Sequence, residues 1–170
     1  MAIREIKKYP DEVLRKKTEP VEDFGDDLQK LIDDMIETMY AAPGVGLAAN
    51  QVGVPKRLTV IDVSVGSEET ALLVLCNPEI ICHEGEEANE EGCLSIPEYT
   101  TMVKRYEKVT VKALDKHGKE VEIEADGLLA RALQHEIDHL NGVLFVDRIG
   151  RIKKEFFKKR YKREQALSNS

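Results

Sequence analysis

Two histidines and a glutamate within one short stretch are the residues best suited to do chemistry. Residues 134–140 read Gln-His-Glu-Ile-Asp-His-Leu, so His135 and His139 are four positions apart. On an α-helix, side chains at that spacing lie one turn apart on the same face. Two such imidazoles can hold one divalent metal, and Glu136 beside them can take a proton from water bound to it. The pattern therefore predicts a metal-dependent hydrolytic site.

A helix over these residues is needed to place the histidines. Asp126 is predicted to cap its start, and Asn141 with Gly142 to end it. The apolar stripe that would face the core consists of Leu129, Leu133, Ile137 and Leu140. The alternative is two unrelated histidines on a half-buried helix, one of them a hydrogen-bonded core residue. The complete H-E-x-x-H pattern in a helical context favours the metal site.

The third metal ligand must come from another part of the chain. A catalytic site usually has three protein ligands and an open position for water. The longer H-E-x-x-H-x-x-G-x-x-H pattern is matched up to Gly142, but its last ligand position is Phe145, which cannot bind metal. Cys93, beside Gly92 and just before Pro97, has the setting of a thiol held at a turn, and a thiol next to a metal ionises readily. A cysteine with two histidines suits zinc or ferrous iron.

A second informative stretch, residues 44–53, is too rich in small residues for a packed strand and too apolar for a solvated loop. Gly44 and Gly46 let the backbone approach another chain or a ligand closely. A phosphate-binding loop is rejected because neither G-K-[ST] nor G-x-G-x-x-G is present. Gln51 is the one polar side chain with reach here. Its simpler interpretation is a glutamine near a turn, hydrogen-bonded to the backbone.

The middle of the chain is predicted to be rich in strands. The expected strands cover residues 58–63, 71–82, 102–114 and 121–124, the last two forming a hairpin around His117 and Gly118. Pro78 predicts a bend or an edge strand. Residues 83–92 are acidic and polar, and are expected to be exposed. His83 and His117 are interpreted as surface residues.

Helices are expected on either side of this region. A short helix starts near Pro10 and Asp11, and a longer one is capped by Asp26 or Asp27 and ended by Pro43 and Gly44. The apolar positions of the longer helix are Leu28, Leu31, Ile32, Met35, Ile36 and Met39. A last helix over residues 148–166 is expected to place its apolar residues on one side: Ile149, Ile152, Phe156 and Leu167.

Composition indicates a globular chain with a highly charged surface. The 170 residues fit one domain, and 34% of them are charged. No stretch approaches the ~20 apolar residues that span a bilayer, and residues 1–10 lack the apolar core of a secretory signal. Three cysteines without framework spacing predict a reducing compartment, the cytoplasm, with Cys76 and Cys82 as inert buried thiols.

Charge is distributed unevenly along the chain. Residues 148–170 carry a net +7, whereas the other residues carry −14. A basic terminal helix could lie on a membrane, bind RNA or simply be solvated. We therefore divide the chain into a catalytic part, residues 1–147, and an appended basic helix and tail, residues 148–170, within one domain.

Three separate stretches resemble the signature motifs of one family. Residues 44–51, 91–95 and 134–140 are similar to the three motifs of peptide deformylases, in the same order and at similar spacing, and the resemblance extends over the whole chain. With the expected elements, it implies an α+β fold in which mixed or antiparallel β-sheets pack around a central metal-binding helix, with a C-terminal helix.

The resemblance also implies a role for each motif residue. Cys93, His135 and His139 would bind one ferrous iron per chain, with zinc, nickel or cobalt as substitutes. Glu136 would be the general base and then the proton donor to the departing amine. Gln51, through its amide, and Leu94, through its backbone N–H, would hold the oxyanion. The substrate-binding residues implied are Gly44, Val45, Gly46, Glu91, Leu128 and Ala132.

Two residues depart from what the resemblance leads one to expect of the methionine pocket. Arg131 and Asn89 occupy positions that are often apolar in the family. We expect Arg131 to keep its charge in solvent and to contribute only its methylene stem to the pocket.

The activity implied is removal of the N-formyl group from the formylmethionine of nascent polypeptides. A metal lowers the pKa of its water toward ~7, so that hydroxide attacks the formyl carbon and formate leaves. The expected partners are nascent peptides and, through the basic helix, the ribosome, with no DNA and no membrane. Two alternatives stay open: a zinc endopeptidase that needs only H-E-x-x-H, and a non-enzymatic protein with a closed structural metal site.

Overall fold

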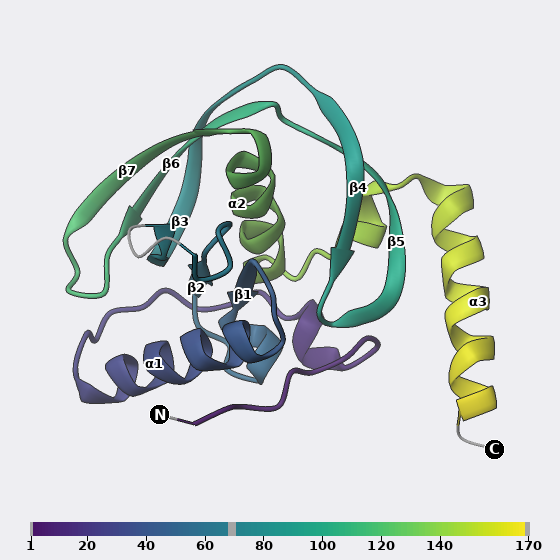
Figure 1. Ribbon diagram of the computed structural model, residues 1–170, viewed down its shortest axis with the longest axis horizontal. Helices are drawn as coiled ribbons and strands as arrows, with labels where there is room; N and C mark the ends of the chain where they lie inside the picture. Colours follow the sequence, from purple (N-terminus) through teal and green to yellow (C-terminus); the bar gives the residue numbers. More distant parts are fainter. Residues whose placement is uncertain (1, 68–70, 169–170) are drawn as a thin grey trace.

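The computed structural model describes residues 2–67 and 71–168 (Figure 1). Its helices are η1 (Glu12–Arg15), α1 (Asp26–Ala41), η2 (Ala49–Val52), α2 (Gly127–Leu140), η4 (Phe145–Arg148) and α3 (Arg151–Ser168), the η elements being 3₁₀ turns. Its strands are β1 (Gly46–Ala48), β2 (Leu58–Ile61), β3 (Leu73–Glu84), β4 (Glu87–Cys93), β5 (Ile96–Arg105), β6 (Lys108–Leu114) and β7 (Glu120–Asp126). No helix of the described part is long and apolar enough to cross a membrane.

The strands form a sheet and a separate ribbon. The five-stranded sheet has the order β1-β2-β3-β6-β7. In the described part of the chain β4 pairs only with β5, and we call this pair the β4–β5 ribbon. All of these pairings are antiparallel. The register of β3 against β6 shifts between Cys76 and Glu79, on either side of Pro78, which confirms the predicted bend. The predicted α+β class is confirmed.

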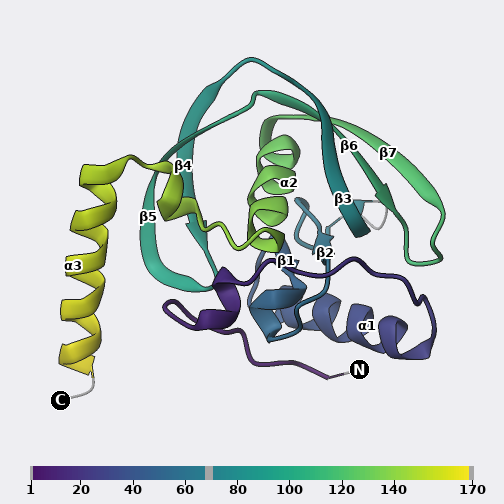
Figure 2. The same cartoon turned by 180° about the vertical axis from the view of Figure 1, so that it is seen from behind.

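Helix α2 lies at the centre, with the five-stranded sheet on one side and the β4–β5 ribbon on the other (Figures 1 and 2). The predicted apolar stripe of α2 points into the core: Leu133 and Ile137 pack with residues of β2, β3 and β6. Helix α1 covers the other end of the sheet, where its predicted stripe packs on β1 and β2. The helix that carries the two histidines is therefore held from both sides.

Several local predictions were wrong. Residues 102–114 form two strands, because the chain turns between β5 and β6 at Tyr106 and Glu107. Residues 83–92 are exposed as predicted, except for the buried Glu91, but most of them belong to β3 and β4, since a two-stranded ribbon tolerates charged side chains on its open face. Cys76 is buried as predicted, but Cys82 is exposed. Asp26 starts α1 instead of capping it, and Gly25 takes the cap position.

Helix α3 packs through aromatic residues that the sequence analysis did not select. Ile152 and Phe156, which were predicted to lie on one apolar side of the helix, are 74% and 69% exposed. The buried residue is Phe157, whose ring centroid lies 4.6 Å from that of Tyr99 and 5.3 Å from that of Tyr9. The side chain of Leu167, also predicted on this face, lies outside the described residues. The helix starts at Arg151, after the 3₁₀ turn η4, and not at residue 148.

Candidate metal centre

Three side chains from two elements meet at one point beside α2. The Sγ atom of Cys93 lies 3.2 Å from Nε2 of His139, and the two histidine Nε2 atoms are 3.1 Å apart. All three possible ligand atoms lie within 4.8 Å of one another. Ligands at 2.0–2.3 Å around one tetrahedral ion would be separated by about 3.3–3.7 Å, so a single zinc or iron ion fits this group after a small outward shift.

The secondary structure explains why these atoms meet. His135 and His139 are one turn apart on α2, as predicted. Cys93 is the last residue of β4 and pairs with Ile96 of β5, so it stands at the tip of the β4–β5 ribbon. The predicted turn at the cysteine is confirmed. The site is thus formed where the ribbon tip reaches the side of the helix.

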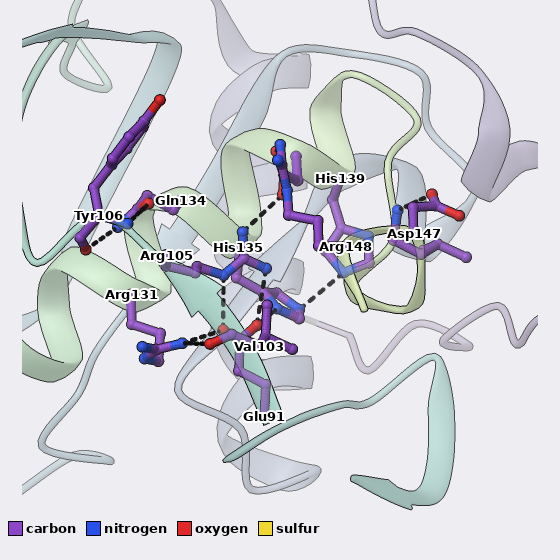
Figure 3. Close-up of polar contacts among 12 residues, drawn as sticks. Glu91, Val103, Arg105, Tyr106, Arg131, Gln134, His135, His139, Asp147 and Arg148 are labelled. Atoms are coloured by element: carbon purple, nitrogen blue, oxygen red, sulfur yellow. Dashed lines mark hydrogen bonds and ion pairs between the residues drawn. The ribbon is translucent and has the colours of Figure 1, made fainter. Parts of the chain in front are cut away.

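Glu91 orients the first histidine. Its Oε1 atom lies 2.9 Å from Nδ1 of His135, which leaves Nε2 of that ring facing the cysteine. Arg105 donates to both carboxylate oxygens of Glu91, at 2.7 and 2.8 Å, and Arg131 donates to Oε2 at 2.7 Å (Figure 3). Burial alone would raise the pKa of Glu91, but the hydrogen bonds from His135 and Arg105 outweigh it and hold that pKa far below its usual range. Glu91 therefore stays ionised.

A second carboxylate continues this buried network. Asp138, on α2, accepts from Arg105 at 2.8 Å and from two nitrogens of Arg148 at 2.6 and 2.7 Å. Arg105 is 5% exposed and is shared between Glu91 and Asp138, so it joins the ribbon to the helix. A buried charge of this kind is tolerated because each group is paired and hydrogen-bonded.

Glu136 has the environment of a proton carrier. It is 3% exposed, its Oε1 lies 4.0 Å from Nε2 of His135, and its Oε2 has no hydrogen-bond partner within the described ranges. Burial raises the pKa of Glu136 to about 7, although nearby His135 and Arg105 act in the opposite direction. A carboxyl group with a pKa near 7 can both accept and release a proton near neutral pH.

Gln51 points toward the cysteine from the other wall. Its Oε1 accepts from the backbone N–H of Ala48 at 2.9 Å, which fixes the amide. Its Nε2 then donates to Oγ of Ser95 at 3.1 Å and lies 3.7 Å from Sγ of Cys93. The two interpretations of Gln51 are thus compatible: one end of its amide is held by the backbone, and the other end faces the site.

A cleft of about 680 Å³ opens in front of these groups. Every residue that the sequence analysis proposed for substrate binding lines it: Gly44, Val45, Gly46, Glu91, Leu128 and Ala132. Gln51, Cys93, Leu94, His135 and Glu136 line it as well. Leu128 is 54% exposed and lies at the mouth, whereas the carboxylate of Glu91 is occupied by the arginines and His135 behind the cleft.

The residues that support the site could not be identified from the sequence. Arg105, Asp138 and Ser95 were not selected, since arginine and aspartate are common in any surface and only the fold brings them together. Arg131 was expected to keep its charge in solvent; this was wrong, because it is 9% exposed and paired with Glu91. One signal could have identified Arg131. It lies one helical turn before His135, on the side of the helix that faces the site, and a buried arginine there needs hydrogen-bond partners.

The fold and the site are those of a metal-dependent hydrolase in which a central helix offers two histidines and a glutamate, and a β-ribbon offers a cysteine as a third possible ligand. Comparison with known sequences agrees with this class of protein and identifies the family within it. The sequence model of the family described as polypeptide deformylase matches residues 3–155. The chain belongs to the polypeptide deformylase family.

Individual relatives support this assignment over nearly the whole chain. The peptide deformylase of Thermodesulfovibrio yellowstonii is 63% identical over 162 residues, covering 95% of this chain and 98% of the relative. A crystal structure of the Legionella pneumophila peptide deformylase superposes with a TM-score of 0.89 at 54% identity, covering 97% of this chain and 98% of that one. The Synechococcus elongatus enzyme, solved in complex with actinonin, gives a TM-score of 0.84 at 47% identity, covering 88% and 82%.

Proposed function

We propose that Cys93, His135 and His139 hold one ferrous iron, and that Glu136 carries protons for the reaction of the family. The chain is an enzyme that removes the N-formyl group from the N-terminal formylmethionine of nascent polypeptides. One observation carries the assignment of residues: three ligand atoms lie within 4.8 Å of one another at the wall of the cleft, beside a buried glutamate with an unpaired oxygen.

A bound divalent metal would lower the pKa of water and polarise the formyl carbonyl. Glu136 receives the proton of the attacking water, because its Oε2 is buried beside the ligand group and has no hydrogen-bond partner among the described residues. It then gives that proton to the methionine nitrogen as the C–N bond breaks, which releases formate and a free amine.

Gln51 and Leu94 stabilise the negative charge on the former carbonyl oxygen. The Gln51 amide nitrogen faces the cysteine and is held in place by Ala48 and Ser95. The backbone N–H of Leu94 follows Cys93 at the ribbon tip, where it can supply a second donor. Losing one donor of this kind typically lowers turnover about 10²–10³-fold.

The peptide would lie along the edge of the sheet. β1 is the terminal strand of the five-stranded sheet and, within the described residues, pairs only with β2. Its first residue, Gly46, lines the cleft together with Gly44 and Val45, which precede it. Gly44, Val45 and Gly46 would therefore pair with the substrate backbone as an added strand. Leu128 and Ala132, on α2, would contact the methionine side chain. The narrow space between Gly46 and Glu136 would exclude acyl groups larger than formyl.

Iron is proposed as the native metal, with zinc, nickel or cobalt as substitutes, because a thiolate and two imidazoles bind each of these ions. Elemental analysis of anaerobically purified protein tests the identity. Stoichiometric iron supports the proposal, and stoichiometric zinc with full activity contradicts it. If iron is native, the isolated enzyme should lose activity in air while the nickel-loaded enzyme keeps it.

The basic helix is proposed to bind the ribosome from the cytoplasm, with residues 148–170 acting as an appendage to the catalytic residues 1–147. Helix α3 exposes lysines and arginines on an otherwise acidic protein, and ribosomal RNA is rich in phosphates. Deleting residues after Gly150 should weaken co-sedimentation with ribosomes, and added salt should weaken binding of the full chain. Unaltered co-sedimentation would contradict this part of the proposal.

The site assignment is tested with three substrates and two variants. Formyl-Met-Ala-Ser should release formate, whereas acetyl-Met-Ala-Ser and an unblocked protein should stay intact. Glu136→Ala should retain metal but lose nearly all turnover, and Cys93→Ala should lose metal. Cleavage of the unblocked protein without formate would favour an endopeptidase. Unchanged metal content in Cys93→Ala would exclude that residue as a ligand.

A further inference from the structure

The β4–β5 ribbon must be placed accurately against α2, because it alone supplies the cysteine. Across residues 2–67 and 71–168 the ribbon has two strands and no pairing with the five-stranded sheet. A two-stranded hairpin is marginally stable by itself. A metal site tolerates ligand displacements of only about 0.2 Å. Some contact between ribbon and helix must therefore set the distance between Cys93 and the two histidines.

Arg131 makes contacts of this kind with both strands. From α2 its Nη1 donates to Oε2 of Glu91 at 2.7 Å and to the carbonyl oxygen of Val103 at 3.0 Å. Its Nη2 donates to the carbonyl oxygen of Glu87 at 2.9 Å. Glu87 and Glu91 belong to β4 and Val103 to β5, so one guanidinium group joins the helix to the two strands. Figure 3 shows Arg131 beside Glu91 and Val103.

Arg131 also shares a partner with a proposed metal ligand. It lies one helical turn before His135, on the same face of α2. Glu91 accepts from Arg131 through Oε2 and from His135 through Oε1. Arg131 thus supplies one of the hydrogen bonds that hold the carboxylate which orients the imidazole, beside the two from Arg105. Arg131 lines the cleft as well, so it is close to the substrate and not in a remote part of the core.

We infer that Arg131 is a positioning residue for the metal site: it fixes the β4–β5 ribbon and Glu91 relative to α2, so that Cys93 and His135 meet at one ion. The inference rests on the proposed ligand set. The planar guanidinium is required, because its nitrogens reach acceptors in three directions at once. A lysine keeps the charge but offers a single nitrogen, which cannot span the same acceptors.

The test compares Arg131→Met and Arg131→Lys with the unmodified protein. Lys104→Met is the matched control, since Lys104 is an exposed cation on β5 whose partner is a surface carboxylate 3.7 Å away. Zinc affinity is measured by competition with a chelator. The environment of the cysteine is followed through the thiolate-to-metal charge-transfer band of the cobalt-loaded protein. Urea unfolding of each apoprotein measures stability separately.

We expect Arg131→Met to weaken zinc binding about tenfold or more and to shift and weaken the cobalt–thiolate band, as is usual when the support of a ligand is removed. Arg131→Lys should lie between Arg131→Met and the unmodified protein, and Lys104→Met should match the unmodified protein. Unchanged affinity and band in Arg131→Met would overturn the inference. So would an equal loss in Lys104→Met.

Two further outcomes distinguish a failure of the role proposed for Arg131 from a failure of the proposed ligand set. If Arg131→Met does not fold, Arg131→Lys decides: zinc affinity equal to that of the unmodified protein would show that charge alone suffices and would refute the positioning role. If Cys93→Ala binds zinc normally, the proposed ligand set fails. Loss of zinc in Cys93→Ala with full affinity in Arg131→Met would leave the ligand set intact and overturn only the role of Arg131.

Discussion

Gly46 lies against the side chain of Glu136, so a methyl group at position 46 tests the geometry of the site directly. A Cβ atom there would lie 3.1 Å from both Cγ and Cδ of Glu136 and 3.3 Å from its Oε1. Ordinary contacts of a Cβ atom are 3.4 Å or longer. The glutamate, or β1, must therefore move by a few tenths of an ångström in the Gly46→Ala variant.

The expected effect on stability follows from this overlap. Forcing an extra methyl group into a packed site costs about 1–3 kcal/mol. Replacing glycine by alanine also restricts the unfolded chain, which stabilises the folded state by roughly 0.4–1 kcal/mol. We therefore expect Gly46→Ala to lower the free energy of unfolding by about 1 kcal/mol. In a Glu136→Ala background the clashing atoms are absent, so the same substitution should be neutral or stabilising.

The assay is a double-mutant cycle. Urea unfolding is measured for the unmodified protein, Gly46→Ala, Glu136→Ala and the double variant, and the coupling energy is the departure from additivity. We expect a coupling of at least ~1 kcal/mol. Formate release by Gly46→Ala should also fall about tenfold or more, since displacing a reacting group by 1 Å can cost about 10²-fold. Strictly additive unfolding energies, or normal turnover in Gly46→Ala, would refute the contact.

The remaining predictions concern other parts of the molecule. Gly142→Ala should destabilise the protein by at least ~2 kcal/mol in urea unfolding, because φ is +76° and the new Cβ would overlap the carbonyl oxygen of Arg15; an unchanged midpoint would contradict this. Burial, and then the hydrogen bond to Asp62, raises the pKa of Tyr40 to about 12. Its contribution to stability is therefore complete below pH 10 and is lost as the pH rises toward 12, by at most ~1.4 kcal/mol per pH unit; Tyr40→Phe should abolish that slope. Removing the metal with a chelator should stop formate release, and added nickel should restore it; activity that survives chelation would exclude a catalytic metal.

The parts of the site that could be predicted are those encoded by local spacing. His135, Glu136 and His139 follow from helical periodicity, and the stripe containing Leu133 and Ile137 places the helix in the core. Cys93 was predicted as a ligand first from its setting at a turn and then from the resemblance to the family motifs. No local signal connects it to the histidines, because its approach to His139 closes a separation of 46 residues through the β4–β5 ribbon.

The predictions that were wrong share a physical cause: burial depends on tertiary contacts that the local sequence does not encode. Charged residues were assigned to solvent, yet Arg131 is buried, since the backbone carbonyls of a neighbouring ribbon can satisfy a guanidinium group. In α3 the sequence offered adjacent phenylalanines, and Phe157 rather than Phe156 is buried. Which of two neighbours packs depends on how the helix leaves η4, and that geometry is set by tertiary contacts.

The packing of α3 constrains more than the helix itself. Tyr161 donates from its hydroxyl to the carbonyl oxygen of Tyr9 at 2.9 Å, and Phe157 is buried between Tyr9 and Tyr99. Tyr9 in turn donates its backbone N–H to Ser95, two residues from the cysteine. The basic helix is thus fastened to the same short segment that borders the cleft. A surface that binds α3 would therefore also determine the direction in which the cleft faces. Binding through the helix would fix the orientation of the cleft at the same time.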